Sequence, residues 1–189
     1  KVSGAWIEDK ATQAVCAMLT EAGYQALFVG GCVRNALLEM PVGDIDIATD
    51  ARPEMGMELA HAAGLKPVPT GLEHGTITVV SGHIGHEVTT FREDVQTFGR
   101  HAVVAFASDL RTDARRRDFT MNALYAQADG AGVDPLGGMA DLRARRVRFI
   151  EDADQRIRED YLRILRFFRF HAWYGDPEGG LDAEGLAAC

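Results

Sequence analysis

Residues 28–50, FVGGCVRNALLEMPVGDIDIATD, decide the fold of this chain. An apolar run ends in the pair Gly30 and Gly31, a helix-like segment follows over 32–40, and two aspartates alternate with isoleucine over 43–49. Apolar runs bounded by glycine indicate strands, and alternation indicates a half-buried strand. The stretch therefore predicts a strand, a glycine turn, a short helix and a second strand that carries carboxylates.

The two aspartates of the second strand are candidate metal ligands. Side chains alternate between the faces of a strand, so Asp44 and Asp46 project together while Ile45 and Ile47 point into the core. The two aspartate Cα atoms would lie roughly 7 Å apart. This spacing suits Mg²⁺, which takes one or two carboxylates and completes its shell with water and substrate phosphates. Taken alone, such a pair is more often a solvated strand face.

The glycine pair is a candidate phosphate cradle. Because Gly30 and Gly31 lack Cβ atoms, backbone N–H groups can approach an anion there, and the following helix adds its positive end. Arg34, one turn into that helix, can add a guanidinium to a phosphate. A glycine pair alone is more often only a turn. Together, the cradle and the two aspartates predict phosphoryl or nucleotidyl transfer.

Composition places the chain among globular proteins. It has 189 residues, of which 47% are hydrophobic and 25% charged, enough for one sizeable core and the start of a second domain. Cys16, Cys32 and Cys189 are far apart, which argues against a disulfide framework or a zinc site and favours the reducing cytoplasm. No apolar run approaches 18 residues, so we expect no membrane anchor.

The charge distribution favours an anionic ligand more than the total charge does. The formal net charge is -8, which argues at first against a nucleic-acid partner. Residues 100–169, however, carry 14 basic side chains against 11 acidic ones, and all 14 are arginine. Arginine is suited to bidentate contact with phosphates and base edges.

The remaining elements follow from periodicity and glycine or proline stops. Glu87 lies in one of two strands that read as a hairpin, and we leave it open as a third acidic group of the site or a solvated strand residue. Residues 93–110 lose periodicity and are interpreted as a long functional loop with Arg100–His101 at its tip. The other predicted elements are a helix over 5–22, strands over 24–29, 74–81 and 86–92, a helix over 53–63, and a turn, helix and strand over 133–150.

Residues 113–125, DARRRDFTMNALY, are interpreted as a helix with an arginine cluster at its start. Cations at a helix N-terminus oppose the macrodipole, so the cluster should have anionic partners. We expect Asp118 to supply one and a triphosphate to supply another. The alternative is a solvated arginine run.

Residues 158–170, REDYLRILRFFRF, are interpreted as one helix with a polar ridge. Asp160 and Arg163, one turn apart, place an acceptor beside a donor. This pair matches the edge of C or A, where an exocyclic amine lies beside a ring-nitrogen acceptor, and is reversed for G and U. The alternative is an ordinary i,i+3 salt bridge. The ridge continues through Arg166 and Arg169, and the predicted buried stripe comprises Ile157, Tyr161, Ile164, Leu165 and Phe168.

Together these motifs resemble the head domain shared by class II tRNA nucleotidyltransferases (CCA-adding enzymes) and bacterial poly(A) polymerases, in the DNA polymerase beta superfamily. The resemblance covers residues 24–174 and consists of GGCVRN with DID, HGT and EVTTFR, RRDFTMNALY, and EDYLRILRFFRF, in the family's order. It implies an α+β fold, a mixed sheet flanked by helices. Residues 1–150 would form the head and 151–189 the start of an all-α neck, with body and tail domains absent.

The resemblance also implies residue roles. Asp44 and Asp46 would bind the catalytic Mg²⁺ ions, while Asp160 and Arg163 would act as a protein template that selects CTP or ATP. Residues 93–110 would be the family's flexible loop. The remaining implied nucleotide-binding residues are Gly30, Gly31, Arg34, Arg117, Arg166 and Arg169. The sequence departs from the family pattern at Asn35, usually aspartate, and at Ala102, usually proline.

The expected function is addition of C, C and A from CTP and ATP to the tRNA 3′ end by two-metal catalysis. Contact with tRNA would be made mostly by domains beyond this chain. The first alternative is a poly(A) polymerase, although residues 66–80, KPVPTGLEHGTITVV, look more like the CCA-adding branch. The second is a nucleotide-binding module without catalysis, against which the intact Asp44 and Asp46 pair argues.

Overall fold

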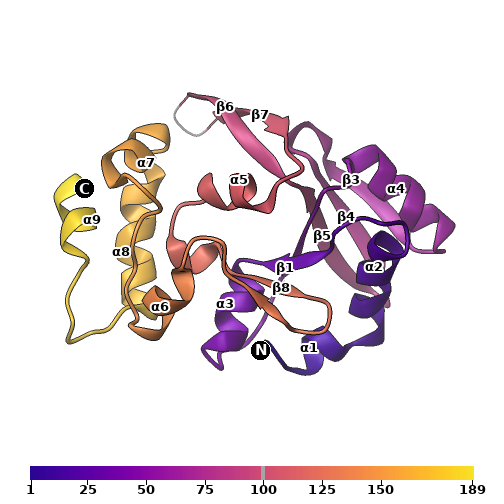
Figure 1. Ribbon diagram of the computed structural model, residues 1–189, viewed down its shortest axis with the longest axis horizontal. Helices are drawn as coiled ribbons and strands as arrows, with labels where there is room; N and C mark the ends of the chain where they lie inside the picture. Colours follow the sequence, from indigo (N-terminus) through magenta and orange to yellow (C-terminus); the bar gives the residue numbers. More distant parts are fainter. Residues whose placement is uncertain (99–100) are drawn as a thin grey trace.

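A mixed sheet forms the centre of the computed structural model, which describes residues 1–98 and 101–189 (Figure 1). Its strand order is β3-β4-β5-β2-β1-β8-β9. Strands β2 and β5 are parallel, and the other neighbours are antiparallel. The strands of this sheet are β1 Leu27–Val29, β2 Ile45–Thr49, β3 Lys66–Gly71, β4 Thr76–Ser81, β5 Ile84–Thr90, β8 Tyr125–Gln127 and β9 Gly132–Val133. A separate hairpin pairs β6 Arg92–Phe98 with β7 His101–Phe106.

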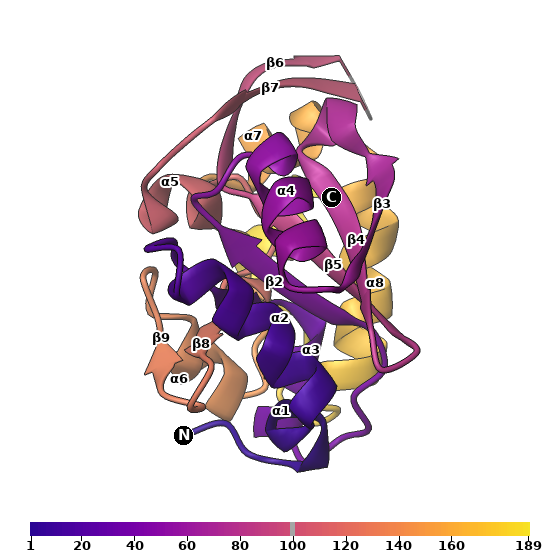
Figure 2. The same ribbon diagram turned by 90° about the vertical axis from the view of Figure 1, so that its right-hand side faces the viewer.

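Helices cover the sheet and extend from one end of it. Helices α2 and α4 pack against β4 and β5 on one face (Figure 2), and α7, α8 and α9 gather at the far end of the molecule (Figure 1). The helices are α1 Ala5–Glu8, α2 Lys10–Thr20, α3 Gly31–Leu37, α4 Pro53–Ala62, α5 Leu110–Arg115, α6 Gly138–Arg143, α7 Ala153–Glu159, α8 Leu162–Tyr174 and α9 Ala183–Ala188, with 3₁₀ turns η1 Leu72–His74 and η2 Thr120–Asn122. This arrangement confirms the predicted mixed α+β fold.

Across residues 1–98 and 101–189, no helix combines the length and the apolar character needed to span a bilayer.

The carboxylate strand and the hairpin form as the sequence predicts. In β2, Ile45 and Ile47 are buried while Asp46 is half-buried. The predicted hairpin is β4 and β5, joined at Gly82 and His83, which both have positive φ, as expected of a tight two-residue turn. The N-terminal helix is divided instead of continuous, because the Asp9 side chain accepts a hydrogen bond from the Ala11 N–H and begins a new helix there.

The prediction of a long loop over residues 93–110 was wrong. The chain forms the β6–β7 hairpin there, and Phe106 on β7 lies against the Arg52 guanidinium, 5.4 Å from its Cζ to the ring centroid. The segment is rich in β-branched and aromatic residues, which favour strands. Of the predicted tip, Arg100 lies outside the described residues, as do the side chains of His101 and Ala102.

The prediction of one helix over residues 113–125 was also wrong. Helix α5 begins earlier, at Leu110, because the Asp109 carboxylate accepts hydrogen bonds from two backbone N–H groups of the first turn. It ends at Arg115, so the arginine cluster lies at the C-terminal end of a helix. Cations are favoured at that end, and the expected conflict with the macrodipole does not arise.

Residues 158–170 do not form one helix either. Helix α7 ends before Asp160, whose Oδ1 accepts a hydrogen bond from the Leu162 N–H at 3.0 Å and starts α8. This break changes the phase of the apolar positions. Of the predicted stripe, Ile157 is buried and Ile164 packs against the core. Tyr161, Leu165 and Phe168 are instead exposed.

The buried face of α8 joins it to the rest of the fold. It consists of Phe167, Phe170 and Tyr174. The Phe167 ring stacks on Phe149 with centroids 5.4 Å apart, and Phe119 lies 4.9 Å from Phe149. Aromatic contacts of this kind add to the free energy gained by burying their area. The cluster fixes α8 against the segments that carry Phe119 and Phe149.

We predict opposite outcomes for two adjacent phenylalanines of α8. Phe167→Ala should lower the free energy of unfolding by about 3–5 kcal/mol, because it empties a fully buried site. Phe168→Ala makes the same chemical change at a side chain that is 43% exposed and should cost no more than about 1 kcal/mol. Urea unfolding of both variants measures the difference. A larger loss for Phe168→Ala would contradict the observed phase of α8.

Candidate active site

The candidate metal ligands meet at the β2–β5 pair. Asp46 on β2 lies opposite Glu87 on β5 in the parallel register, and Asp44 is exposed just before β2. Burial, together with the neighbouring Glu87, raises the pKa of Asp46 to about 7 against the opposing effect of Arg117. The fold thus places the carboxylates of Asp46 and Glu87 side by side, with Asp46 partly shielded from solvent.

The chemistry of this pair fits a bound cation. The Oδ1 atom of Asp46 is buried and has no hydrogen-bond partner among the described residues. An unpaired buried carboxylate oxygen is costly unless a cation or proton satisfies it. In the described part of the chain, no three His, Cys, Asp or Glu side chains converge to form a complete metal site. Any ion held here would therefore take part of its shell from water or substrate.

The glycine turn lies against two arginines. Gly30 has φ of 73° before the first residue of α3, a conformation that favours glycine. A Cβ atom placed on Gly30 would lie 3.8 Å from Arg117 Nη1, and one on Gly31 would lie 3.5 Å from Arg34 Nη2. The backbone of the turn therefore forms one wall of a space that two guanidinium groups also face.

Arg34 is held by protein contacts. It is 7% exposed, and its Nη1 donates to Asn122 Oδ1 at 2.6 Å while Nη2 donates to the Tyr174 hydroxyl at 2.8 Å. Its Nε donates to Asn35 Oδ1 at 3.1 Å, so asparagine at this position orients the arginine. Burial lowers the pKa of Arg34. Arg34 thus connects α3 to η2 and α8, and its contact with phosphate stays a prediction.

Arg117 is held by two residues outside the predicted set. Its Nη2 lies 3.2 Å from Asp113 Oδ2, and its Nε donates to the Tyr125 hydroxyl at 3.3 Å. The side chain is 22% exposed. Arg117 therefore reaches the space beside the glycine turn from a fixed base.

Asp160 and Arg163 do not form the salt bridge considered from the sequence. Arg163 Nη1 donates to Glu159 Oε2 at 2.7 Å and to the carbonyl of Arg156, and its Nη2 donates to the carbonyl of Arg116 at 3.2 Å. Asp160 lies at the break between α7 and α8. Both side chains keep hydrogen-bonding capacity beyond these contacts.

The predicted ridge divides after Arg166. Arg166 Nε donates to Asp118 Oδ2 at 2.7 Å. Arg169 is exposed, and its guanidinium carbon lies 6.0 Å from the Trp173 ring centroid. Residues three apart rotate steadily around an α-helix. Arg169 has therefore left the face that carries Arg163.

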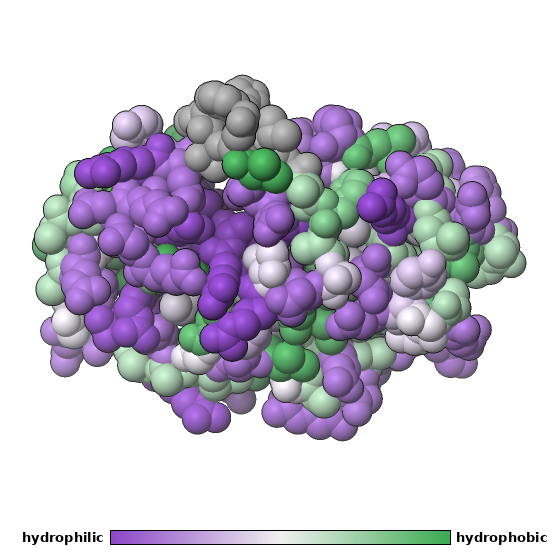
Figure 3. All heavy atoms as spheres, turned by 45° about the horizontal axis from the view of Figure 1, so that its top comes forward, coloured by the Kyte–Doolittle hydropathy of each residue, from purple (hydrophilic) through white to green (hydrophobic). Residues whose placement is uncertain are grey.

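Most of the predicted site residues line one cavity of about 460 Å³. Hydrophilic side chains gather on this side of the molecule, between the hairpin and α7–α8 (Figure 3). Of the predicted residues, Asp44, Glu87 and Arg169 are outside the lining. The lining consists of Gly30, Gly31, Arg34, Asp46, Arg116, Arg117, Asp118, Asn122, Asp160, Leu162, Arg163, Arg166 and Phe170.

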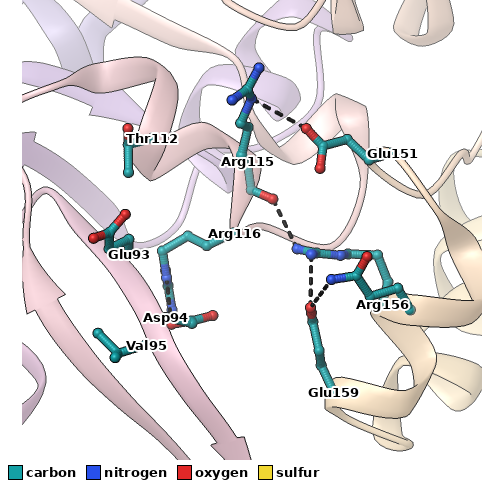
Figure 4. A pocket seen from close by; sticks show the side chains of 10 residues that line it. Glu93, Asp94, Val95, Thr112, Arg115, Arg116, Glu151, Arg156 and Glu159 are labelled. Carbon is teal, nitrogen blue, oxygen red and sulfur yellow. Dashed lines mark hydrogen bonds and ion pairs between the residues drawn. The ribbon is translucent and has the colours of Figure 1, made fainter.

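The arginines of the cluster at 115–117 pair with other acidic residues than the predicted Asp118. Asp118 pairs with Arg166 and not with the cluster. Arg115 pairs with Glu151 at 3.2 Å and Arg116 with Asp94 at 3.1 Å around a second cavity of about 400 Å³ (Figure 4). These partners lie 22 or more residues away in sequence. No local spacing could have indicated them.

Comparison with known proteins agrees with this geometry. CCA tRNA nucleotidyltransferase 1, mitochondrial, of Mus musculus is 42% identical over 172 residues, covering 90% of this chain and 40% of that protein. The CCA-adding enzyme of Lactobacillus delbrueckii subsp. bulgaricus is 44% identical over 168 residues, covering 87% and 41%. The chain thus spans about 40% of the length of these curated relatives.

A solved structure and a family model agree with these relatives. The crystal structure of the Bacillus stearothermophilus CCA-adding enzyme in complex with CTP superposes with a TM-score of 0.83 at 38% identity, covering 95% of this chain and 42% of that one. The model of the poly A polymerase head domain matches residues 26–148, more than half of the chain. The chain therefore belongs to the poly A polymerase head-domain family.

Proposed function

We propose that this chain is the catalytic head of an RNA nucleotidyltransferase that adds C, C and A, from CTP and ATP, to the 3′ end of tRNA. One observation carries the proposal. A single cavity is lined by the carboxylate of Asp46, the glycine turn, and the pair Asp160 and Arg163. It therefore offers groups for a metal, a triphosphate and a base in one space.

The carboxylates would hold Mg²⁺. Asp44 and Asp46 are the proposed ligands, with Glu87 beside Asp46 as a further acidic group, and the unpartnered Asp46 oxygen supports this assignment. When bound, Mg²⁺ supplies positive charge that activates a hydroxyl nucleophile and neutralises the triphosphate. Arg117 would bind the triphosphate beside the glycine turn, and Arg34 would fix the helix that follows the turn.

Asp160 and Arg163 would select the base. Three of the five N–H donors of a guanidinium are engaged in Arg163 by Glu159 and two carbonyl groups. Within the described residues, two donors therefore remain for a ligand, while Asp160 uses one carboxylate oxygen on the Leu162 N–H. A carboxylate acceptor for the exocyclic amine, beside a donor for the ring nitrogen, fits C and A and opposes G and U.

The partner RNA is also proposed. The solved structure of a tRNA nucleotidyltransferase complexed with a primer tRNA and an incoming ATP analog superposes on this chain with a TM-score of 0.73 at 29% identity. Because the chain spans only part of such proteins, most of the tRNA contact would come from their other domains. A cytoplasmic location stays a prediction from the cysteine pattern, since one relative is named as mitochondrial.

The proposal is tested by nucleotide incorporation with Mg²⁺. The protein that carries this chain is supplied with labelled CTP, ATP, GTP or UTP and with tRNAs that end before CCA, after one C or after CC. Two C residues followed by one A, with GTP and UTP rejected, is the expected result. An open-ended A tract would identify a poly(A) polymerase instead. Absence of any incorporation would leave a nucleotide-binding module.

We predict that Asp44→Ala abolishes incorporation and preserves the fold. Removing an outer-shell partner of a metal site typically costs about 10–100-fold, so loss of a ligand should exceed 100-fold. Because Asp44 is exposed, the thermal midpoint should change little. Glu58→Ala removes an exposed carboxylate from α4 and serves as the control. A folded Asp44→Ala variant with near wild-type incorporation would exclude the proposed metal site.

We predict that Arg163→Lys relaxes base choice. Lysine keeps the charge but loses the planar set of donors, so discrimination of CTP and ATP against GTP and UTP should fall by about tenfold or more. The exposed Arg158 of α7 provides a matched control, Arg158→Lys. The measurement is kcat/KM for each nucleotide. Unchanged discrimination would remove Arg163 from base selection.

A further inference from the structure

A buried carboxylate behind the candidate active site contacts three donors. Asp113, on α5, is 1% exposed. Its Oδ2 accepts hydrogen bonds from Arg117 Nη2 at 3.2 Å and from the Tyr125 hydroxyl at 2.8 Å. Its Oδ1 lies 3.3 Å from the backbone nitrogen of Arg92, which donates to it. Asp113 and Tyr125 are absent from the residues that line the cavity, so they lie behind Arg117.

The three side chains form a closed triangle. Arg117 Nε donates to the Tyr125 hydroxyl, the hydroxyl donates to Asp113, and Arg117 Nη2 donates to the same Asp113 oxygen. Two nitrogens of one planar guanidinium are thus bound to two different residues. Rotation about the last side-chain bonds of Arg117 would break at least one of these contacts.

The closed triangle leaves one edge of Arg117 for a ligand. Its Nη1 makes no hydrogen bond within residues 1–98 and 101–189, and it is the atom nearest the Cβ position of Gly30, at 3.8 Å. That edge therefore faces the glycine turn. An isolated arginine would populate many rotamers, and ordering it at the moment of binding would reduce affinity.

The charges within the triangle favour the same arrangement. Burial raises the pKa of Tyr125, and Asp113 raises it further while Arg117 opposes this. The phenol therefore keeps the proton that it donates. Burial acts to lower the pKa of Arg117, but its contacts with Tyr125 and Asp113 raise it overall. Arg117 therefore stays charged although it is largely enclosed.

We propose that Asp113 and Tyr125 are positioning residues for the incoming nucleotide, because they hold Arg117 in the orientation in which its open edge faces the triphosphate. The inference rests on the proposed function, since it takes Arg117 to be a nucleotide contact. Neither residue touches the ligand itself. Both act through Arg117, and their removal should weaken nucleotide binding.

The experiment uses the full chain, with CTP and Mg²⁺ as the probe and no RNA. Tyr125→Phe removes one hydroxyl and should raise the Kd for CTP about tenfold, the loss expected for one hydrogen bond to a charged group. Asp113→Asn removes the charge and should raise it up to about 100-fold, the scale of a misplaced contact. Asp109→Asn makes the same chemical change at the residue that caps α5. It should leave the Kd unchanged, because asparagine caps a helix about as well as aspartate.

Two further readouts separate positioning from a general structural role. The first is the Nε–H resonance of Arg117 without nucleotide, which should be sharp in the wild type and lost to solvent exchange in Tyr125→Phe. The second is a double-mutant cycle, in which Asp113→Asn should add little to the Kd of the Arg117→Lys variant. Thermal midpoints identify any variant that fails to fold. If Asp113→Asn fails to fold, the more conservative Tyr125→Phe still tests the inference.

The outcomes separate the two levels of the argument. Wild-type protein that binds CTP, together with Asp113→Asn and Tyr125→Phe variants that bind it equally well, would overturn the inference alone. An equal loss from Asp113→Asn with and without Arg117 would also overturn it. Wild-type protein that binds no CTP, while the Arg117 resonance is sharp, would overturn the proposed function and the nucleotide role of the triangle with it.

Discussion

The parallel register of β2 against β5 is the constraint on which the candidate site depends. It places Asp46 beside Glu87. Ile45 and Ile47 on β2 and Val88 on β5 are buried, and a slip of one residue would exchange every core side chain with a solvent-facing one. The hydrophobic faces therefore fix the position of the carboxylates. Electrostatic repulsion between Asp46 and Glu87 is a consequence of this register.

The second constraint is the junction between the sheet and α8. Phe119, Phe149 and Phe167 pack together where α8 meets the rest of the fold. Phe170 extends this packing beneath Arg34, whose guanidinium carbon is 5.1 Å from the Phe170 ring centroid. The apolar cluster brings the helix close, and the arginines fix its orientation. Asp160, at the break before α8, is thereby held in the lining of the cavity that Asp46 also lines.

The parts of the site that depend on short-range signals were predictable from the sequence. Strand alternation identifies Asp46, and a glycine pair after an apolar run identifies the turn beside Arg117. The phase of α8 was not predictable in the same way. An aspartate at Asp160 can lie within a helix or cap a new one, and only the surrounding packing decides between these conformations. The partners of Arg116 and Arg117 were also missed, because Asp94 and Tyr125 reach them through the tertiary fold.

The contacts that join α7 and α8 to the rest of the fold depend mainly on arginine side chains. Among the described residues, the side-chain hydrogen bonds that link α7 and α8 to the rest of the fold are donated by guanidinium groups. They run from Arg34 to Tyr174, from Arg166 to Asp118, from Arg163 to the Arg116 carbonyl and from Arg156 to the Arg115 carbonyl. Arginine keeps its charge throughout the physiological pH range. Exposed ion pairs, such as that of the 41% exposed Arg166, are weakened by dissolved ions. Added salt should therefore weaken the contact of α8 with the rest of the fold through this ion pair, while the charge of the arginines does not change with acidity in this range.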